Sequence, residues 1–138
     1  MNIIERLKRS IALRGDDVFV RADFAKLGSD EQVGRAIKTL QADGRIVRLG
    51  KGVYARAKPS ALSGKPIPVR PVEELAPAAL KKLGVQVRPS LAAQRYNAQA
   101  TTQIPAGVVL NTGRKRISRK ISFGNVTVRY ENDFSRTR

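Results

Sequence analysis

Hydrogen-bond donors between residues 29 and 51 are spaced so that a helix followed by a hairpin would gather them on one surface. Guanidinium, ammonium, amide and hydroxyl groups donate hydrogen bonds to phosphate oxygens and to base edges. These residues therefore favour binding to nucleic acid, with the helix contacting bases and the hairpin contacting phosphates or the minor groove. The set comprises Ser29, Gln32, Arg35, Lys38 and Thr39 in the helical part, and Arg45, Arg48 and Lys51 after it.

The helix that would carry the first group has sequence signals at both of its ends. Ser29 is a favourable N-cap and Gln32 follows it at capping-box spacing, which predicts that the helix begins close to Asp30. Gly44 lies just past the last apolar position, where a helix C-cap belongs. The buried stripe is predicted from apolar residues at helical spacing: Val33, Ala36, Ile37 and Leu40.

The elements around this helix predict a winged helix-turn-helix. Residues 3–11 and 23–27 are expected to form two earlier helices, and residues 18–20 a very short strand. Residues 45–49 and 53–56 are short β-type runs around a glycine-containing turn, which is a hairpin signal. Helix, turn, helix and hairpin in this order are typical of DNA-binding domains. The same geometry also packs helices in proteins that bind no DNA.

Charge favours the DNA interpretation over plain helix packing. The chain of 138 residues has a formal net charge of +16, which implies a polyanionic partner. The predicted hairpin carries Arg45, Arg48, Lys51 and Arg56 and no acidic residue. Asp30 and Glu31 oppose contact with phosphates, but they fall in the first helical turn, where they suit the helix dipole.

The chain is predicted to be an α+β protein with two domains. Residues 58–71 are rich in proline, serine and glycine without any period, so they are interpreted as a linker. The linker would separate a winged helix-turn-helix at residues 1–57 from a small basic α+β domain at residues 72–131, and residues 132–138 would form a disordered tail. Residues 1–57 hold 12 basic and 7 acidic residues, and residues 58–138 hold 15 and 4. The second half is therefore the more basic one.

The second domain is expected to contain a β-hairpin at its end. Gly124-Asn125 joins the β-rich runs 116–123 and 126–131, which is a strong signal for a tight turn. Such a turn pairs Phe123 with Val126 and places Lys120 opposite Arg129. Earlier in the domain we expect one helix or a helix pair over residues 72–83, short strands at residues 85–87 and 108–110, and an ambiguous stretch at residues 90–99.

The opposed charges in this hairpin suggest a second site. Like charges placed directly opposite each other destabilise a hairpin, so a face that tolerates them is screened either by solvent or by a bound anion. The candidate anion- or partner-binding set is Arg114, Lys115, Arg116, Lys120 and Arg129. A solvated basic face is the alternative. If the module binds RNA, Tyr96 or Tyr130 would stack on bases.

Composition excludes several classes of function. The sequence contains no cysteine and no histidine, which removes thiolate and imidazole metal ligands and the commonest general base. The 11 acidic residues form no convincing catalytic pair, so we expect neither an enzyme, nor a bound metal, nor a cofactor. No apolar run approaches the length of a membrane span and no secretory signal is evident, so a cytoplasmic protein is expected.

Residues 14–56 resemble the N-terminal winged-helix domain of AbiEi-type antitoxins and their small bacterial relatives. The second half resembles the short second domain of the same relatives less specifically, and it is much shorter than in the longer AbiEi antitoxins. The resemblance covers about the first 57 residues well and rests on Arg14, Gly15, Val18, Phe19, Phe24, Gly28, Ser29, Gly44, Arg45, Ile46, Gly52 and Tyr54.

This resemblance implies the antitoxin of a type IV toxin–antitoxin operon. Such a protein represses its own promoter through the winged helix and counteracts a nucleotidyltransferase-like toxin. Its partners would be double-stranded DNA at its own operator and that toxin, and an oligomer is possible. The alternatives are a DNA-binding regulator without a toxin partner and an RNA-binding module that uses the basic C-terminal hairpin.

Overall fold

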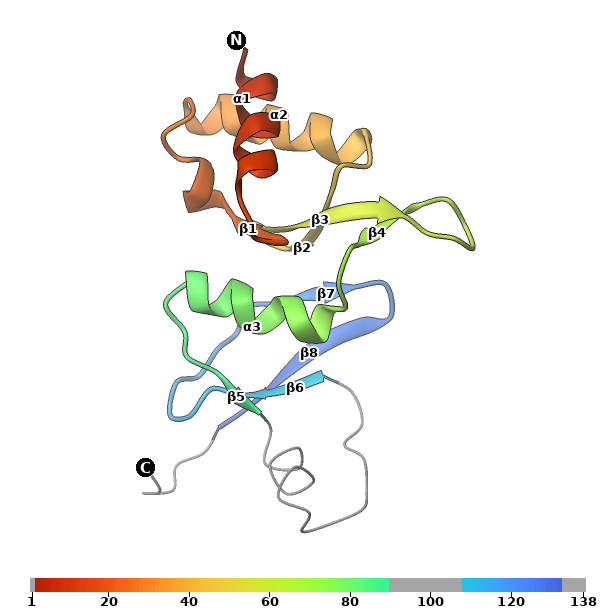
Figure 1. Cartoon of the computed structure of the whole chain (residues 1–138). Coiled ribbons are helices and arrows are strands. Elements are labelled where there is room, and N and C mark those ends of the chain that lie inside the picture. The colour runs from red at the N-terminus through yellow and green to blue at the C-terminus, as the bar shows by residue number, and fades with distance from the viewer. Residues whose placement is uncertain (1, 90–107, 133–138) are drawn as a thin grey trace. The chain divides into compact units, whose positions relative to one another are not determined.

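Helices and strands both contribute to the structure, a computed structural model that describes residues 2–89 and 108–132 (Figure 1). The chain is an α+β protein, as predicted. It divides into unit 1, Met1–Pro71, and unit 2, Val72–Arg138. None of the helices in the described ranges is long and apolar enough to cross a membrane. The predictions for residues 90–99 and 133–138 lie outside the described residues.

Unit 1 has the element order that the sequence predicts. The central strand of its sheet is β3, which pairs antiparallel with β1 on one side and β2 on the other. The bounds are α1 Ile3–Leu13, β1 Val18–Val20, a 3₁₀ helix η1 Arg21–Phe24, α2 Asp30–Ala42, β2 Ile46–Gly50, β3 Val53–Pro59 and β4 Pro66–Pro68. The expected helix over residues 23–27 is wrong in position and type, because the chain makes a single 3₁₀ turn that ends at Phe24.

The core of unit 1 lies between its helices and one face of its sheet. Phe19 from β1 and Phe24 from η1 are fully buried, with ring centroids 5.9 Å apart. All four predicted α2 positions are buried with them, as are Leu7 and Ile11 of α1. The apolar periodicity of both α-helices therefore marks their inner faces, because burial of an amphipathic stripe is what holds short helices in place.

Arg56 of β3 connects the sheet to the end of α1. Its guanidinium donates to the carbonyl oxygens of Ile11, Arg14 and Asp16 at 3.0, 3.1 and 2.9 Å. It also pairs with the Asp17 carboxylate at 3.4 Å and lies over the Phe19 ring, 5.5 Å from the centroid. Arg56 is thus a structural residue of unit 1 and does not belong to the basic surface of the hairpin.

The stretch predicted to be a linker forms a second hairpin instead. Strand β3 continues to Pro59, and β4 pairs with its end in the register Ala57 to Pro68 and Pro59 to Pro66. Within the turn, Ser60 Oγ accepts hydrogen bonds from the backbone amides of Leu62 and Ser63. The β3–β4 turn extends beyond the other strands of the sheet (Figure 1). Proline is compatible with β4 because this strand lies at a sheet edge, where some amides need no partner.

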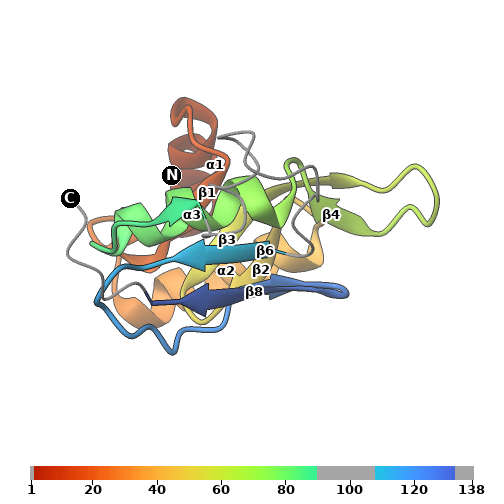
Figure 2. The same ribbon diagram turned by 90° about the horizontal axis from the view of Figure 1, so that it is seen from below.

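In the described residues of unit 2, one helix packs against a four-stranded sheet. Helix α3, Val72–Lys82, runs through Pro77 as one helix and contacts β6 and β8. The strands are β5 Arg88–Pro89, β6 Val108–Asn111, β7 Ser122–Phe123 and β8 Val126–Glu131, in the order β5-β6-β8-β7. Strand β5 begins just after the residues predicted for it, whereas β6 matches its prediction. Figure 2 shows β6 and β8 side by side and pointing the same way.

The predicted C-terminal hairpin is only partly correct. Its turn and first pairs are confirmed, because Phe123 pairs with Val126 and Ser122 with Thr127. The Val128 amide still donates to the Ile121 carbonyl at 2.9 Å, but no strand pair follows, so the expected pair of Lys120 with Arg129 is wrong as a strand pair. On the other edge of β8, Arg129 is in register with Val109 of β6, in the parallel pairing. Residues 116–121, predicted as the longer part of the antiparallel partner, form a loop.

Replacement of Arg56 by alanine should destabilise unit 1 by roughly 2–3 kcal/mol, because it leaves carbonyl oxygens at the end of α1 without their charged donor. Hydrogen exchange of the α1 and β1 amides measures this loss specifically for unit 1. Lys58→Ala is the control, since this exposed residue lies on the same strand. Equal exchange in the two variants would contradict the structural role of Arg56.

Candidate nucleic-acid interface

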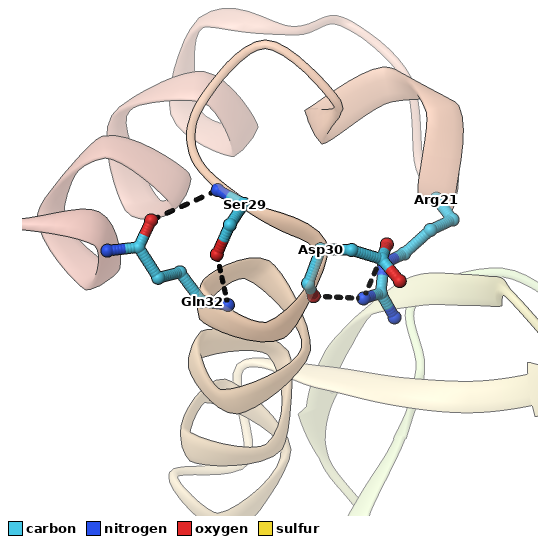
Figure 3. Close-up of polar contacts among 4 residues, drawn as sticks. All are labelled: Arg21, Ser29, Asp30 and Gln32. Atoms are coloured by element: carbon cyan, nitrogen blue, oxygen red, sulfur yellow. Dashed lines mark hydrogen bonds and ion pairs between the residues drawn. The ribbon is translucent and has the colours of Figure 1, made fainter.

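Helix α2 is bounded by two complete capping motifs. At its start, Ser29 Oγ accepts from the Gln32 amide at 3.1 Å, and Gln32 Oε1 accepts from the Ser29 amide at 3.0 Å (Figure 3). At its end, Gly44 has a φ of 76°, and the Arg45 amide donates to the Leu40 carbonyl at 3.0 Å. This left-handed glycine closure is a Schellman motif. The helix therefore has fixed ends before any partner binds.

The predicted contact residues of α2 form a continuous exposed face. Arg35, Lys38 and Thr39 are all exposed, on the side away from the buried stripe. Lys38 and Thr39 each lie about one helical turn after Arg35. The Thr39 hydroxyl donates to the Arg35 carbonyl at 3.1 Å, so its remaining capacity is that of an acceptor. Glu31 is exposed on the same side. The face thus offers two cations, one acceptor hydroxyl and one carboxylate.

Ser29 and Gln32 have a structural role in addition to the predicted contact with DNA, which stays a prediction. Each side-chain oxygen accepts one hydrogen bond of the capping box, and this bond fixes the position of the side chain at the start of the helix. The Gln32 amide NH₂ and the Ser29 hydroxyl hydrogen remain as donors. Both residues are consequently suited to phosphate oxygens or to base acceptors.

Arg21 joins the start of α2 to the β2–β3 turn, and sequence reasoning missed it. One of its guanidinium nitrogens donates to the Asp30 carbonyl and lies 3.0 Å from Asp30 Oδ1 (Figure 3). Its backbone amide donates to the Gly52 carbonyl at 3.0 Å. A Cβ added at Gly34 would lie 3.1 Å from the same guanidinium. The glycine in mid-helix, unfavourable by propensity, was the available signal for this close approach.

The β2–β3 hairpin presents the remaining predicted cations. Arg45, Arg48 and Lys51 are exposed, at the base, the strand and the turn of the hairpin respectively. Arg48 Nε donates to the Gly50 carbonyl at 3.2 Å, which holds this side chain along the hairpin. Gly52 has a φ of 71°, a conformation that permits the tight turn around Lys51. The hairpin thus carries three cations beside a helix that carries two.

The second predicted set of cations lies in unit 2. Arg114, Lys115, Arg116 and Lys120 are exposed on the segment between β6 and β7, and Arg129 is exposed on β8. Tyr130, considered as a base-stacking residue, donates its hydroxyl to the Arg119 carbonyl at 2.7 Å. Burial raises the pKa of this phenol above 10.0, and the charge of Arg119 opposes that shift. Tyr96 lies outside the described residues.

A family model matches residues 2–136, which is nearly the whole chain. The chain belongs to DUF6088, a family of unknown function. No curated protein matches it. Within residues 2–89 and 108–132 of this DUF6088 protein, no three His, Cys, Asp or Glu side chains gather as they would around a metal ion.

Ser29→Ala should weaken the start of α2 by about 1 kcal/mol, because the cap hydroxyl is lost. Gln32→Glu should leave that stability unchanged, since a glutamate at this position preserves the capping box. Hydrogen exchange of the first α2 amides measures both effects. A loss in Gln32→Glu as large as in Ser29→Ala would show that the reciprocal cap is absent in solution.

Tyr130 should titrate at a pH above 10.0 in the folded protein. As the pH rises, an unfolded chain then loses this proton first, so the stability of unit 2 is unaffected below about pH 10 and falls above it. Difference titration of tyrosinate absorbance between the parent protein and Tyr130→Phe isolates this one residue. A midpoint below 10.0 would mean that the phenol is exposed and that its bond to Arg119 is not made.

Proposed function

We propose that this DUF6088 protein is a DNA-binding transcriptional repressor that acts on its own operator through α2 and the β2–β3 hairpin. The observation that carries the proposal is the exposed cationic face of α2, with Arg35 and Lys38, next to a hairpin that carries Arg48 and Lys51. The order α1, β1, η1, α2, β2, β3 is also that of a winged helix-turn-helix, in which the last helix enters the major groove.

Within this proposal the two elements have different tasks. Arg35 has the fork of donors that suits guanine in the major groove, and Lys38 lies beside it on the same face. Arg48 and Lys51 contact phosphates or the adjacent minor groove, which positions the helix without specifying sequence. Ser29 and Gln32 add donors at the start of α2, close to the positive end of the helix dipole.

The resemblance to AbiEi-type antitoxins extends the proposal to a biological setting. A protein of that kind acts in the cytoplasm as the antitoxin of a type IV operon and counteracts a nucleotidyltransferase-like toxin. Coexpression with the product of a neighbouring gene tests this part directly, because an antitoxin restores growth and a plain regulator does not. DNA binding and toxin neutralisation are separable, so failure of the second leaves the first in place.

Three substitutions on the proposed interface should have three different effects on DNA binding. Arg35→Ala should cost roughly 1–3 kcal/mol on the operator and relax specificity at particular base pairs. Lys51→Ala should weaken operator and random DNA about equally, because a phosphate contact is independent of sequence. Glu31→Gln should strengthen both, since it removes a carboxylate from the face that meets phosphates.

Footprinting of the DNA upstream of the gene, followed by titrations at several salt concentrations, provides the measurement. We expect a slope of log affinity against log salt of about −4 or steeper, as for five or more neutralised phosphates. A slope near zero would rule out the nucleic-acid function. Equal losses on operator and random DNA for Arg35→Ala would rule out α2 as the element that contacts bases.

A further inference from the structure

The connection between β6 and β7 concentrates positive charge more than any other segment of the described chain. We call residues 112–121 the crossover loop, because β6 and β8 are parallel and the chain must return along the sheet between them. The loop contains no acidic residue. Its five cationic side chains are all exposed: Arg114, Lys115, Arg116, Arg119 and Lys120.

Neutral side chains hold the backbone of the crossover loop in place. Asn132 Nδ2 donates to the carbonyls of Gly113 and Lys115 at 3.1 and 2.6 Å. The Thr112 hydroxyl donates to the same Lys115 carbonyl at 2.6 Å. The Tyr130 hydroxyl donates to the Arg119 carbonyl at 2.7 Å. Lys115 Nζ also donates to the Gly84 carbonyl at 3.4 Å. Together these contacts fix the shape of the loop.

The fixed shape of the crossover loop keeps five like charges close together in sequence. Neighbouring cations repel one another, and a free loop would spread them apart. Here the clamp formed by Asn132, Thr112 and Tyr130 works against that repulsion. Fixing charges in advance lowers the entropy that a partner must overcome on binding. The arrangement is therefore that of a preordered anion site.

We propose that the crossover loop binds the sugar–phosphate backbone of a double-stranded nucleic acid. This site is additional to the proposed function, which rests on α2 and the β2–β3 hairpin of unit 1. Single strands are bound largely by base stacking on aromatic rings. The Tyr130 ring is instead partly buried, with its hydroxyl bonded to the loop. Exposed cations beside a phenol that is already bonded to the loop suit the backbone of a duplex, which is recognised by charge and not by base edges.

The double variant Arg116→Gln/Lys120→Gln in the full chain tests the proposal on duplexes of random sequence. Loss of two phosphate contacts should make the slope of log affinity against log salt about 2 units less steep, at roughly 0.9 per contact. The matched control, Arg9→Gln/Lys81→Gln, removes the same charge from exposed positions on α1 and α3 and should leave the slope unchanged. Equal slopes for the double variant and the parent protein would overturn the proposal.

The variant Asn132→Ala separates preordering from charge. It keeps every cation but removes the donor to Gly113 and Lys115, so affinity should fall several-fold while the salt slope stays the same. Hydrogen exchange of α3 confirms that unit 2 is folded in each variant. Unchanged affinity in Asn132→Ala would show that the loop is not a preordered site.

The probes also decide what the site recognises. DNA and RNA duplexes of one sequence show which duplex is the source of the phosphates. Tighter binding to single-stranded RNA, or binding to polyglutamate without binding to duplexes, would overturn the proposal in favour of a base-stacking or an acidic protein partner. The result is distinguishable from the proposed function, because Arg35→Ala acts on the operator and the loop variants act on any duplex.

Discussion

The guanidinium of Arg56 is the contact on which the arrangement of unit 1 depends. The last carbonyls of a helix lack intrahelical partners and carry the negative end of its dipole. Arg56 donates to the carbonyl of Ile11 in α1 and to that of Arg14, just after the helix. Its contact with the Phe19 ring fixes it to the core. Because β3 is the central strand, Arg56 joins the end of α1 to the middle of the sheet, in addition to the packing of Leu7 and Ile11 in the core.

The same strand links Arg56 to the candidate interface. Strand β3 pairs with β2 to make the cationic hairpin, and the turn between them receives the amide of Arg21. Arg21 in turn holds the first residue of α2 through Asp30. The hairpin and the helix are thus joined by a continuous series of hydrogen bonds, which keeps Arg35 and Lys51 in a constant relation before any ligand arrives.

Local signals in the sequence predict the elements of unit 1 well, because caps, periodicity and turn glycines act over a few residues. The start of α2 at Asp30, its buried stripe and the strand over residues 18–20 are confirmed. Contacts distant in sequence were not predictable in this way. Arg56 bonds residues more than 40 positions away, and the parallel pairing of β6 with β8 depends on no short motif. Residues 58–71 are rich in proline, which is rare inside strands, so the sequence predicts a linker there. The structure forms β4 in this stretch because an edge strand tolerates proline.

In the candidate site, too, local features are predictable from the sequence and contacts between distant residues are not. Exposure of Arg35, Lys38, Arg48 and Lys51 follows from helical and hairpin geometry, so the sequence predicts it correctly. The sequence also predicts the engagement of Ser29 and Gln32 in the cap, and the structure confirms it. The cap uses one lone pair of each side-chain oxygen and leaves the donor hydrogens, so the predicted contact with DNA is compatible with it. Arg21 escaped notice because its partners, Asp30 and Gly52, come together only in the folded unit.

The strand order of unit 2 has a consequence for the way the chain acquires its structure. All pairings of unit 1 close within residues 18–68, whereas β8, which lies between β6 and β7, is synthesised after every other strand in the described part of the chain. Strand β6 can pair with β5 earlier, but its pairing with β8 must wait until the crossover loop has been made, and long loops slow such closure. Unit 1 can complete its core on the nascent chain while α3 still lacks the strand that covers its apolar face.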